Sequence, residues 1–137
     1  MKKIIVVLGA LFCLEASALQ QIKLQNLVAY DGDTVKTSIR PFQDLPPLSI
    51  RVRGIDTPEI RGKCLSEKAR AQQAKQLMNN LLRDQTITVV PYSWDKYGGR
   101  VVADLYDPNN VKISDIMIRE GLARPYNGGA KASWCNQ

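Results

Sequence analysis

The chain has 137 residues, with 19 lysines and arginines, 13 aspartates and glutamates, and no histidine. The absence of histidine excludes serine–histidine and cysteine–histidine nucleophiles, histidine-ligated zinc and paired-histidine acid–base chemistry. Any reaction must therefore use carboxylates, arginine, lysine, tyrosine, hydroxyls, thiols or a metal. The length suits one domain, the apolar fraction of 45% indicates a globular fold, and the net charge of +6 favours an anionic partner.

The first 18 residues are predicted to be a secretory signal peptide. Lys2 and Lys3 precede an apolar run over residues 4–14, which is too short to span a bilayer comfortably. Small residues then offer a signal-peptidase site, so we expect cleavage between Ala18 and Leu19. A buried N-terminal helix is the alternative interpretation of the same run. With cleavage, residues 19–137 would form one exported domain, periplasmic or secreted, with no membrane span.

Two cysteines, Cys64 and Cys135, follow the predicted leader. An oxidising compartment favours a disulfide bond between them, and two unpaired thiols are the alternative. Closing so long a loop would stabilise the fold by about 4 kcal/mol on the chain-entropy model.

Three β-like segments come first in the mature chain: Gln21–Tyr30, Thr34–Arg40 and Leu48–Ile55. The second and third alternate between apolar and polar residues, which is the period of a strand with one buried face. Asp31-Gly32 is a turn signal between the first two. We therefore expect three strands before the first helix.

The clearest helix follows Ser66, which is a favoured N-cap residue. Its apolar stripe recurs at helical spacing and consists of Ala74, Leu77, Met78, Leu81 and Leu82. Strands are expected at Thr86–Pro91 and Arg100–Tyr106. A short helix is expected to be capped by Ser114, to run through Glu120 and to end at Gly121. The order of three strands, a helix, two strands and a helix predicts a mainly β fold with helices (α+β), namely a five-stranded Greek-key barrel of the OB type.

Two acidic turns, Asp31–Thr34 and Asp56–Glu59, stand out among the polar residues. Two carboxylates from separate turns, with backbone carbonyls and water, form the ligand set of a hard cation such as Ca²⁺ or Mg²⁺. The lack of imidazole and sulfur sites disfavours a softer metal. Ordinary turn chemistry would equally explain the first segment, and a helix entrance would explain the second.

Arginines near these turns suggest a phosphate ligand. Arg51 and Arg53 point the same way on the predicted strand that leads to Asp56. Arg100 follows a pair of glycines. A guanidinium offers two parallel donors to a phosphate and stays charged at any working pH. Arginines beside a carboxylate-bound cation are typical of phosphoryl transfer, in which a glutamate can act as general base toward water, and solvated surface charge is the alternative for each arginine.

Four short motifs occur in the order and at the spacing of one known family. They are Asp31-Gly32-Asp33-Thr34, Arg51 with Gly54-Ile55-Asp56-Thr57-Pro58-Glu59, Asp95-Lys96-Tyr97-Gly98-Gly99-Arg100, and Arg119-Glu120-Gly121-Leu122-Ala123. With these motifs the sequence resembles the staphylococcal nuclease (thermonuclease) family from about Val28 to Tyr126. The resemblance implies an OB-fold barrel carrying helices. It also implies a Ca²⁺-dependent phosphodiesterase that acts on DNA and RNA and leaves 3′-phosphate ends.

The resemblance also implies roles for the acidic residues. Asp33 and Asp56 would be carboxylate ligands of one Ca²⁺, and the main-chain carbonyl of Thr57 would be a third protein ligand. Asp31 would lie behind these ligands rather than on the ion. Glu59 would be the general base that activates the attacking water.

The same resemblance implies roles for basic residues. Arg51 would bind the phosphate, and Arg100 would stabilise the transition state and the leaving oxygen. Lys96 and Tyr97 would help to hold the nucleotide. Single- and double-stranded DNA and RNA are the implied substrates, with little base specificity, and the protein is expected to be a monomer. The family motif has one glycine fewer, and the pair Gly98-Gly99 would absorb the extra residue before Arg100.

Two other functions remain open at the level of sequence. A non-catalytic nucleic-acid-binding barrel of the same fold would explain the charge without requiring the acidic residues. A basic secreted barrel that binds an acidic polysaccharide or protein would also leave the spacing of the acids unexplained. For the nuclease, a bond between Cys64 and Cys135 is further expected to steady the loop that carries Glu59.

Overall fold

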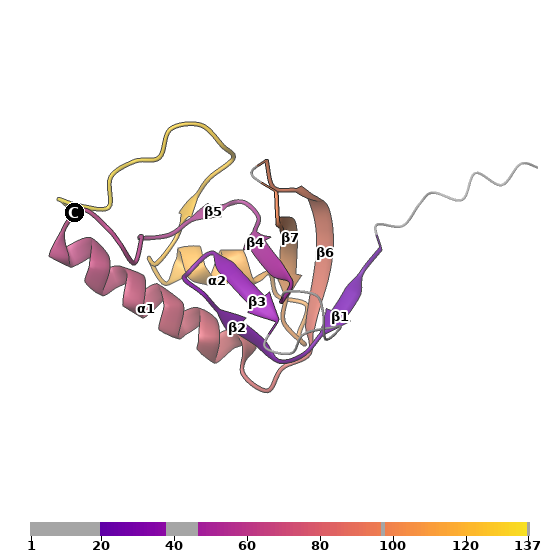
Figure 1. Ribbon diagram of the computed structural model, residues 1–137. Coiled ribbons are helices and arrows are strands. Elements are labelled where there is room, and N and C mark those ends of the chain that lie inside the picture. The colour runs from indigo at the N-terminus through magenta and orange to yellow at the C-terminus, as the bar shows by residue number, and fades with distance from the viewer. Residues whose placement is uncertain (1–19, 38–46, 97, 137) are drawn as a thin grey trace, which may run out of the picture.

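The computed structural model describes residues 20–37, 47–96 and 98–136 (Figure 1). The predicted signal peptide at 1–18 lies outside these residues, as does Tyr97. The strands within them are β1 (Ile22–Leu24), β2 (Leu27–Ala29), β3 (Thr34–Thr37), β4 (Ser49–Val52), β5 (Ile55–Asp56), β6 (Ile87–Trp94), β7 (Arg100–Tyr106) and β8 (Arg124–Pro125). The helices are α1 (Leu65–Leu82) and α2 (Ile113–Arg119).

The main sheet is curled, as its strand order requires. Its six strands lie in the order β1-β6-β7-β4-β3-β2, so β1 and β2 form opposite edges. Only Gln25 and Asn26 separate these two strands in the chain, so the Cα atoms of Leu24 and Leu27 lie at most about 11 Å apart. The edges must therefore approach each other, and Asn26 makes the bend with a φ of 56°. The result is a half-closed barrel with two helices packed against it, which confirms the predicted mainly β fold with helices (Figure 1).

Two of the predicted strands are divided in the structure. The segment 21–30 splits at Asn26 into β1 and β2, which gives the sheet six strands instead of the expected five. The segment 48–55 turns at Gly54, which has a φ of 82°, so β4 stays in the main sheet while β5 leaves it. β5 then pairs with β8, a strand that the sequence did not predict, and this pair carries Asp56.

The remaining predicted strands match more closely. β3 begins at Thr34, and residues 38–40 of that prediction lie outside the described residues. β6 continues past Pro91 to Trp94 through an irregular register, and β7 has the predicted bounds. β4 and β7 run parallel, whereas the other neighbouring strands in the main sheet are antiparallel.

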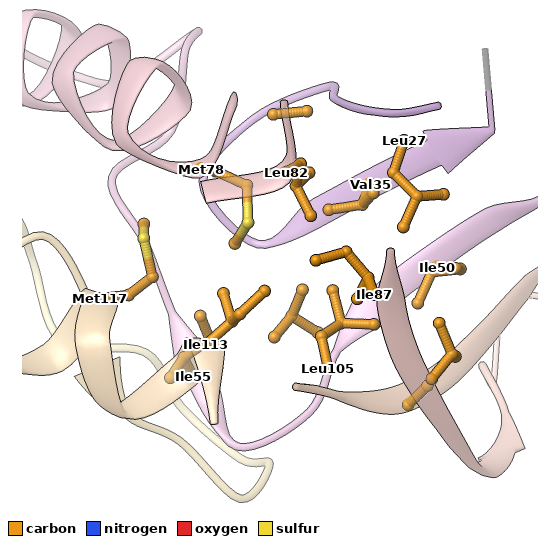
Figure 2. Close-up of a cluster of buried hydrophobic side chains, with 14 of the residues drawn as sticks. Leu27, Val35, Ile50, Ile55, Met78, Leu82, Ile87, Leu105, Ile113 and Met117 are labelled. Atoms are coloured by element: carbon orange, nitrogen blue, oxygen red, sulfur yellow. The ribbon is translucent and has the colours of Figure 1, made fainter. Parts of the chain in front are cut away.

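The core lies between the main sheet and the two helices. Figure 2 shows Met78 and Leu82 of α1, and Ile113 and Met117 of α2, gathered with apolar side chains of the strands. The fully buried strand residues include Val35, Ile50, Val52, Ile87 and Leu105. In the predicted stripe of α1, Ala74, Met78 and Leu82 are buried, and Leu77 and Leu81 pack against them from the margin. Burial of this stripe fixes α1 beneath β2 and hence beneath the turn that carries Asp33.

The starts of both helices correct the predicted caps. α1 begins with Cys64 as its N-cap residue, and Ser66 lies inside the helix. α2 begins at Ile113, and Ser114 is buried within it. Gly121, with a φ of 72°, follows α2 as predicted. Neither helix, nor any other helical segment among the described residues, is long and apolar enough to cross a membrane.

Candidate active site

The turn between β2 and β3 is shaped by Asp31. Its Oδ1 accepts hydrogen bonds from the backbone N–H groups of Asp33 (3.0 Å) and Thr34 (2.7 Å). The Asp33 side chain is then held in a buried position, with the residue 7% exposed. Asp31 therefore orders the backbone of the turn that presents Asp33.

Gly32 allows this turn to pack against the segment that carries Asp56. A Cβ at Gly32 would lie 2.8 Å from Cβ of Ala74 in α1 and 2.9 Å from Cβ of Thr57, which is closer than carbon atoms pack. The backbone N–H of Thr57 donates a hydrogen bond to Asp33 Oδ2 (3.1 Å). The two acidic turns are thus held side by side by a close approach that only glycine permits.

Asp56 presents both carboxylate oxygens to the C-terminal segment. The residue is 4% exposed, and its Oδ2 accepts a hydrogen bond from the indole N–H of Trp134 (3.0 Å). Its Oδ1 forms an ion pair with Lys131 Nζ at 2.8 Å. A buried carboxylate with an oxygen that faces a cationic group is also suited to a metal cation.

Glu59 lies on the loop that follows β5, with 57% of its side chain exposed. Its Oε1 is 3.4 Å from Lys131 Nζ, so one ammonium group lies between Glu59 and Asp56. Its backbone N–H donates to Glu67 Oε1 (3.3 Å) in α1. The carboxylate is therefore open to water while its backbone is anchored, which is the arrangement that a general base needs.

Glu67 is a residue whose importance the sequence did not reveal. It is 6% exposed, and besides Glu59 it accepts the backbone N–H of Lys63 (2.8 Å) at Oε2. An acid in the first turn of a helix is ordinarily a partner of the helix dipole. Here it reaches backwards and satisfies two backbone donors of the loop, in place of the side-chain cap expected from Ser66.

The disulfide Cys64–Cys135 is present and joins the start of α1 to the C-terminal segment, with 6.1 Å between the Cα atoms. Cys135 Sγ lies 3.7 Å from Glu67 Oε2, so the bond packs against the residue that anchors the Glu59 loop. Cys64, Glu67 and Cys135 have the proximity of metal ligands, but both sulfurs are used in the disulfide. We therefore assign this cluster a structural role.

Reduction of this disulfide is expected to lower both the melting temperature and the nuclease activity that the family resemblance implies. The bond closes a separation of 71 residues, which would contribute about 4 kcal/mol on the chain-entropy model, and its loss also loosens the contact behind Glu67. The measurement is a thermal melt and a cleavage assay with and without reductant. A variant with Cys64→Ser and Cys135→Ser is the control, because it should not respond to reductant. Unchanged melting and activity in the reduced wild type would contradict the expectation.

Arg51 links the acidic turns from behind. Its Nη2 lies 3.3 Å from Asp33 Oδ2, and the guanidinium donates to the carbonyl oxygens of Val52 (2.7 Å) and Ile55 (2.8 Å). Its side chain is 14% exposed. Arg51 thus holds Asp33 against the β4–β5 turn in addition to the phosphate contact that the resemblance implies.

Arg100 stands at the start of β7. Its Nη2 lies 2.7 Å from Asp95 Oδ2, and the backbone N–H of Asp95 donates to the Arg100 carbonyl (2.9 Å). Gly98 and Gly99 have φ values of 74° and 73°, a left-handed conformation that favours glycine. The glycine pair forms the turn that leads into β7, and Arg100 lies opposite Ser49 of β4.

A cleft of about 640 Å³ opens beside these arginines. Arg51, Arg100, Lys96 and Lys131 line it, together with exposed aromatic side chains of β6. Among its described lining residues, Asp95 is the single acid. The cleft is therefore suited to a polyanion. Tyr97, the other residue predicted to hold the nucleotide, lies outside the described residues.

Arg53, two residues after Arg51 in the sequence, does not pair with the acidic turns but with Asp104. Its Nη1 lies 3.1 Å from Asp104 Oδ2, and its guanidinium stacks 3.9 Å from the ring centroid of Tyr92. These contacts hold one wall of the cleft.

The pKa of Asp31 is raised from 3.8 to about 6, chiefly by burial and next by the nearby charge of Asp33, while hydrogen bonds from the turn backbone lower it in part. The native state therefore holds the Asp31 proton more tightly than the unfolded chain does. As a consequence, stability falls as the pH rises from about 4 to about 6, and the loss is complete above that window.

Asp31→Asn should therefore stabilise the metal-free protein selectively above about pH 6. Asparagine keeps an Oδ1 acceptor for the turn but carries no charge. We expect a gain of about 2 kcal/mol over wild type at neutral pH, after solvent screening, and little difference near pH 4. Urea denaturation in chelator at both pH values measures this. A difference that does not change with pH would contradict the expectation.

The C-terminal segment contains two further site residues that the sequence did not reveal, Lys131 and Trp134. Partial burial lowers the pKa of Lys131, but the contact with Asp56 and the charges of Asp56, Asp33 and Glu59 outweigh it and raise the pKa above its usual value. Trp134 is 5% exposed between Asp56 and Arg124, whose guanidinium lies 3.7 Å from the indole centroid. No periodicity marks these residues in the sequence, because their contacts are long-range.

Comparison of the sequence with known proteins identifies the family to which this chain belongs. Residues 49–133 match the family described as Staphylococcal nuclease homologue. The chain is 27% identical over 96 residues to an uncharacterized endonuclease of Escherichia coli, an alignment covering 70% of this chain and 56% of that protein. It is 33% identical over 86 residues to a probable endonuclease of Schizosaccharomyces pombe, covering 59% of this chain and 37% of that protein.

The chain thus spans roughly half or less of the length of these relatives. The family match begins at β4 and contains Arg51, Asp56, Glu59 and Arg100, whereas Asp33 joins them through the pairing of β3 with β4. Because this match covers more than half of the chain, the protein belongs to the staphylococcal nuclease homologue family.

Proposed function

We propose that this protein is an exported nuclease, a Ca²⁺-dependent phosphodiesterase that hydrolyses DNA and RNA to 3′-phosphate products. The observation that carries the proposal is the arrangement of Asp33 and Asp56, buried side by side, next to an arginine-lined cleft and the exposed Glu59. Family membership and the endonuclease names of the two relatives support it.

The acidic residues suit a hard divalent cation. The carboxylates of Asp33 and Asp56 and the carbonyl of Thr57 would hold the ion. The buried Asp56 already has one oxygen in contact with a cationic group, the Lys131 ammonium at 2.8 Å. Bound Ca²⁺ would supply positive charge that stabilises the negative charge developing on the phosphate.

Glu59 and the two arginines perform the rest of the reaction. The Glu59 carboxylate takes a proton from water as the water oxygen attacks phosphorus, and the bond from phosphorus to the 5′ oxygen breaks. Arg51 and Arg100 stabilise the phosphate and leaving oxygens through charge-assisted hydrogen bonds. The leaving oxygen takes a proton from solvent, so the products are a 3′-phosphate and a 5′-hydroxyl. These contacts address the backbone, so little base specificity is expected.

The test is a cleavage assay on single- and double-stranded DNA and on RNA, with Ca²⁺, other divalent cations or a chelator, followed by analysis of the product ends. Calcium-dependent 3′-phosphate products are expected. Asp33→Asn should weaken metal binding and so reduce the calcium-dependent cleavage, whereas Asp115→Asn, which alters an exposed acid on α2, should leave it unchanged. Binding without cleavage would instead indicate the non-catalytic barrel, and no binding would indicate a different acidic partner.

Export is the part of the proposal that rests on residues 1–18. Mass analysis of the protein from the periplasm or the culture medium should show cleavage between Ala18 and Leu19. Recovery of the uncleaved chain with the cells would contradict it.

A further inference from the structure

The C-terminal segment after β8 folds back onto the acidic turns and is fastened on both sides of Lys131. Before it, the N–H of Tyr126 donates to the Gly54 carbonyl (2.9 Å). After it, Trp134 donates to Asp56, and Cys135 is bonded to Cys64. The position of Lys131 is therefore set by the fold on either side of it.

Lys131 occupies the place where the carboxylates converge. Its Nζ lies 2.8 Å from Asp56 Oδ1 and 3.4 Å from Glu59 Oε1, and the charge of Asp33 also acts on it. Asp56 Oδ1 is one of the oxygens that the proposed function assigns to the ion. A lysine ammonium and a divalent cation cannot both be in contact with this oxygen at such distances without strong repulsion.

We propose that Lys131 is an internal cation of the carboxylate site, which a divalent ion must displace, so that the tethered C-terminal segment sets the affinity of the site for metal. This inference rests on the proposed function, because it takes Asp33 and Asp56 as the metal ligands. Displacement moves the ammonium away from Asp56 Oδ1 and towards the cleft that Lys131 already lines beside Arg51 and Arg100.

The experiment measures Ca²⁺ binding to the whole protein by titration calorimetry, without nucleic acid. Lys131→Met should bind Ca²⁺ about tenfold more tightly than wild type, because the competing charge is removed. Lys112→Met is the matched control, since it removes an ammonium that pairs with Asp104 (3.0 Å), and it should leave the affinity unchanged. An affinity in Lys131→Met equal to or weaker than that of wild type would overturn the inference, as would the absence of calcium binding in both proteins.

The tether is tested by a second comparison. In protein carrying Cys64→Ser and Cys135→Ser, the segment is released and Lys131→Met should add much less than its tenfold gain. An undiminished gain would overturn the role given to the disulfide. Because no substrate is present, these results are separate from the cleavage assay. A protein that cleaves nucleic acid with Ca²⁺ but shows no change in Lys131→Met overturns this inference alone, whereas a failure to cleave overturns the proposed function.

Discussion

Glu59→Gln is expected to lower the rate of phosphodiester cleavage by about 10²–10⁴-fold, with little change in nucleic-acid affinity. Glutamine has nearly the shape of glutamate but cannot accept the proton of the attacking water. The backbone N–H of residue 59 would still donate to Glu67, so the loop should keep its position. Single-turnover cleavage and binding in chelator measure the two quantities separately.

The control for this substitution is Glu120→Gln, which alters a half-exposed glutamate at the end of α2, away from the acidic turns. It should cleave at the wild-type rate. The pH profile gives a second reading, since a chain without histidine should show no imidazole titration in its activity. A rate for Glu59→Gln within a few-fold of wild type would refute the assignment of Glu59 as general base.

Arg51→Lys is expected to reduce both activity and stability, although the charge is conserved. The guanidinium of Arg51 reaches Asp33 Oδ2 and the carbonyl oxygens of Val52 and Ile55 at once. A single ammonium cannot span these acceptors, nor can it present two parallel donors to a phosphate. Leaving buried acceptors unpaired costs about 1–3 kcal/mol, and the cleavage rate should fall by about 10²-fold or more.

The measurements are urea denaturation and the cleavage assay on the same preparation. Arg119→Lys is the matched control, because the Arg119 side chain is 70% exposed and pairs weakly with Glu120. It should leave both quantities unchanged. If Arg51→Lys lost activity without any loss of stability, the contacts behind the site would be less important than the phosphate contact. Activity close to wild type would contradict both roles.

The strands and helices of this protein were largely predictable because their signals are local. Alternation identified β3 and β4, and the spacing of Ala74, Met78 and Leu82 identified α1. The errors occurred where tertiary contacts decided the outcome. Ser66 is not the cap, because Glu67 turns back to the loop and the chain enters the helix at the disulfide-bonded Cys64. β8 is too short to have a pattern and exists only because β5 lies opposite it.

The acidic turns and the arginines could also be identified in the sequence, because their residue types are chemically distinctive and lie in short motifs. What joins them could not. In the sequence, Gly32 looks like an ordinary turn residue. Only the structure shows that it packs so closely against Ala74 and Thr57 that a side chain would not fit. Glu67, Lys131 and Trp134 contact the site from positions without any motif.

The sequence by itself determined the chemistry that is open to this protein. Without histidine, a base must be sought among the carboxylates, and transition-state charge must come from the arginines and a cation. The family resemblance implies these roles for Glu59, Arg51, Arg100, Asp33 and Asp56. Only the tertiary structure decided which charges meet. The distance between Lys131 and Asp56 depends on the disulfide, on Trp134 and on the curl of the sheet. A local sequence pattern carries no information on such distances, because the fold sets them between residues that are remote in the chain.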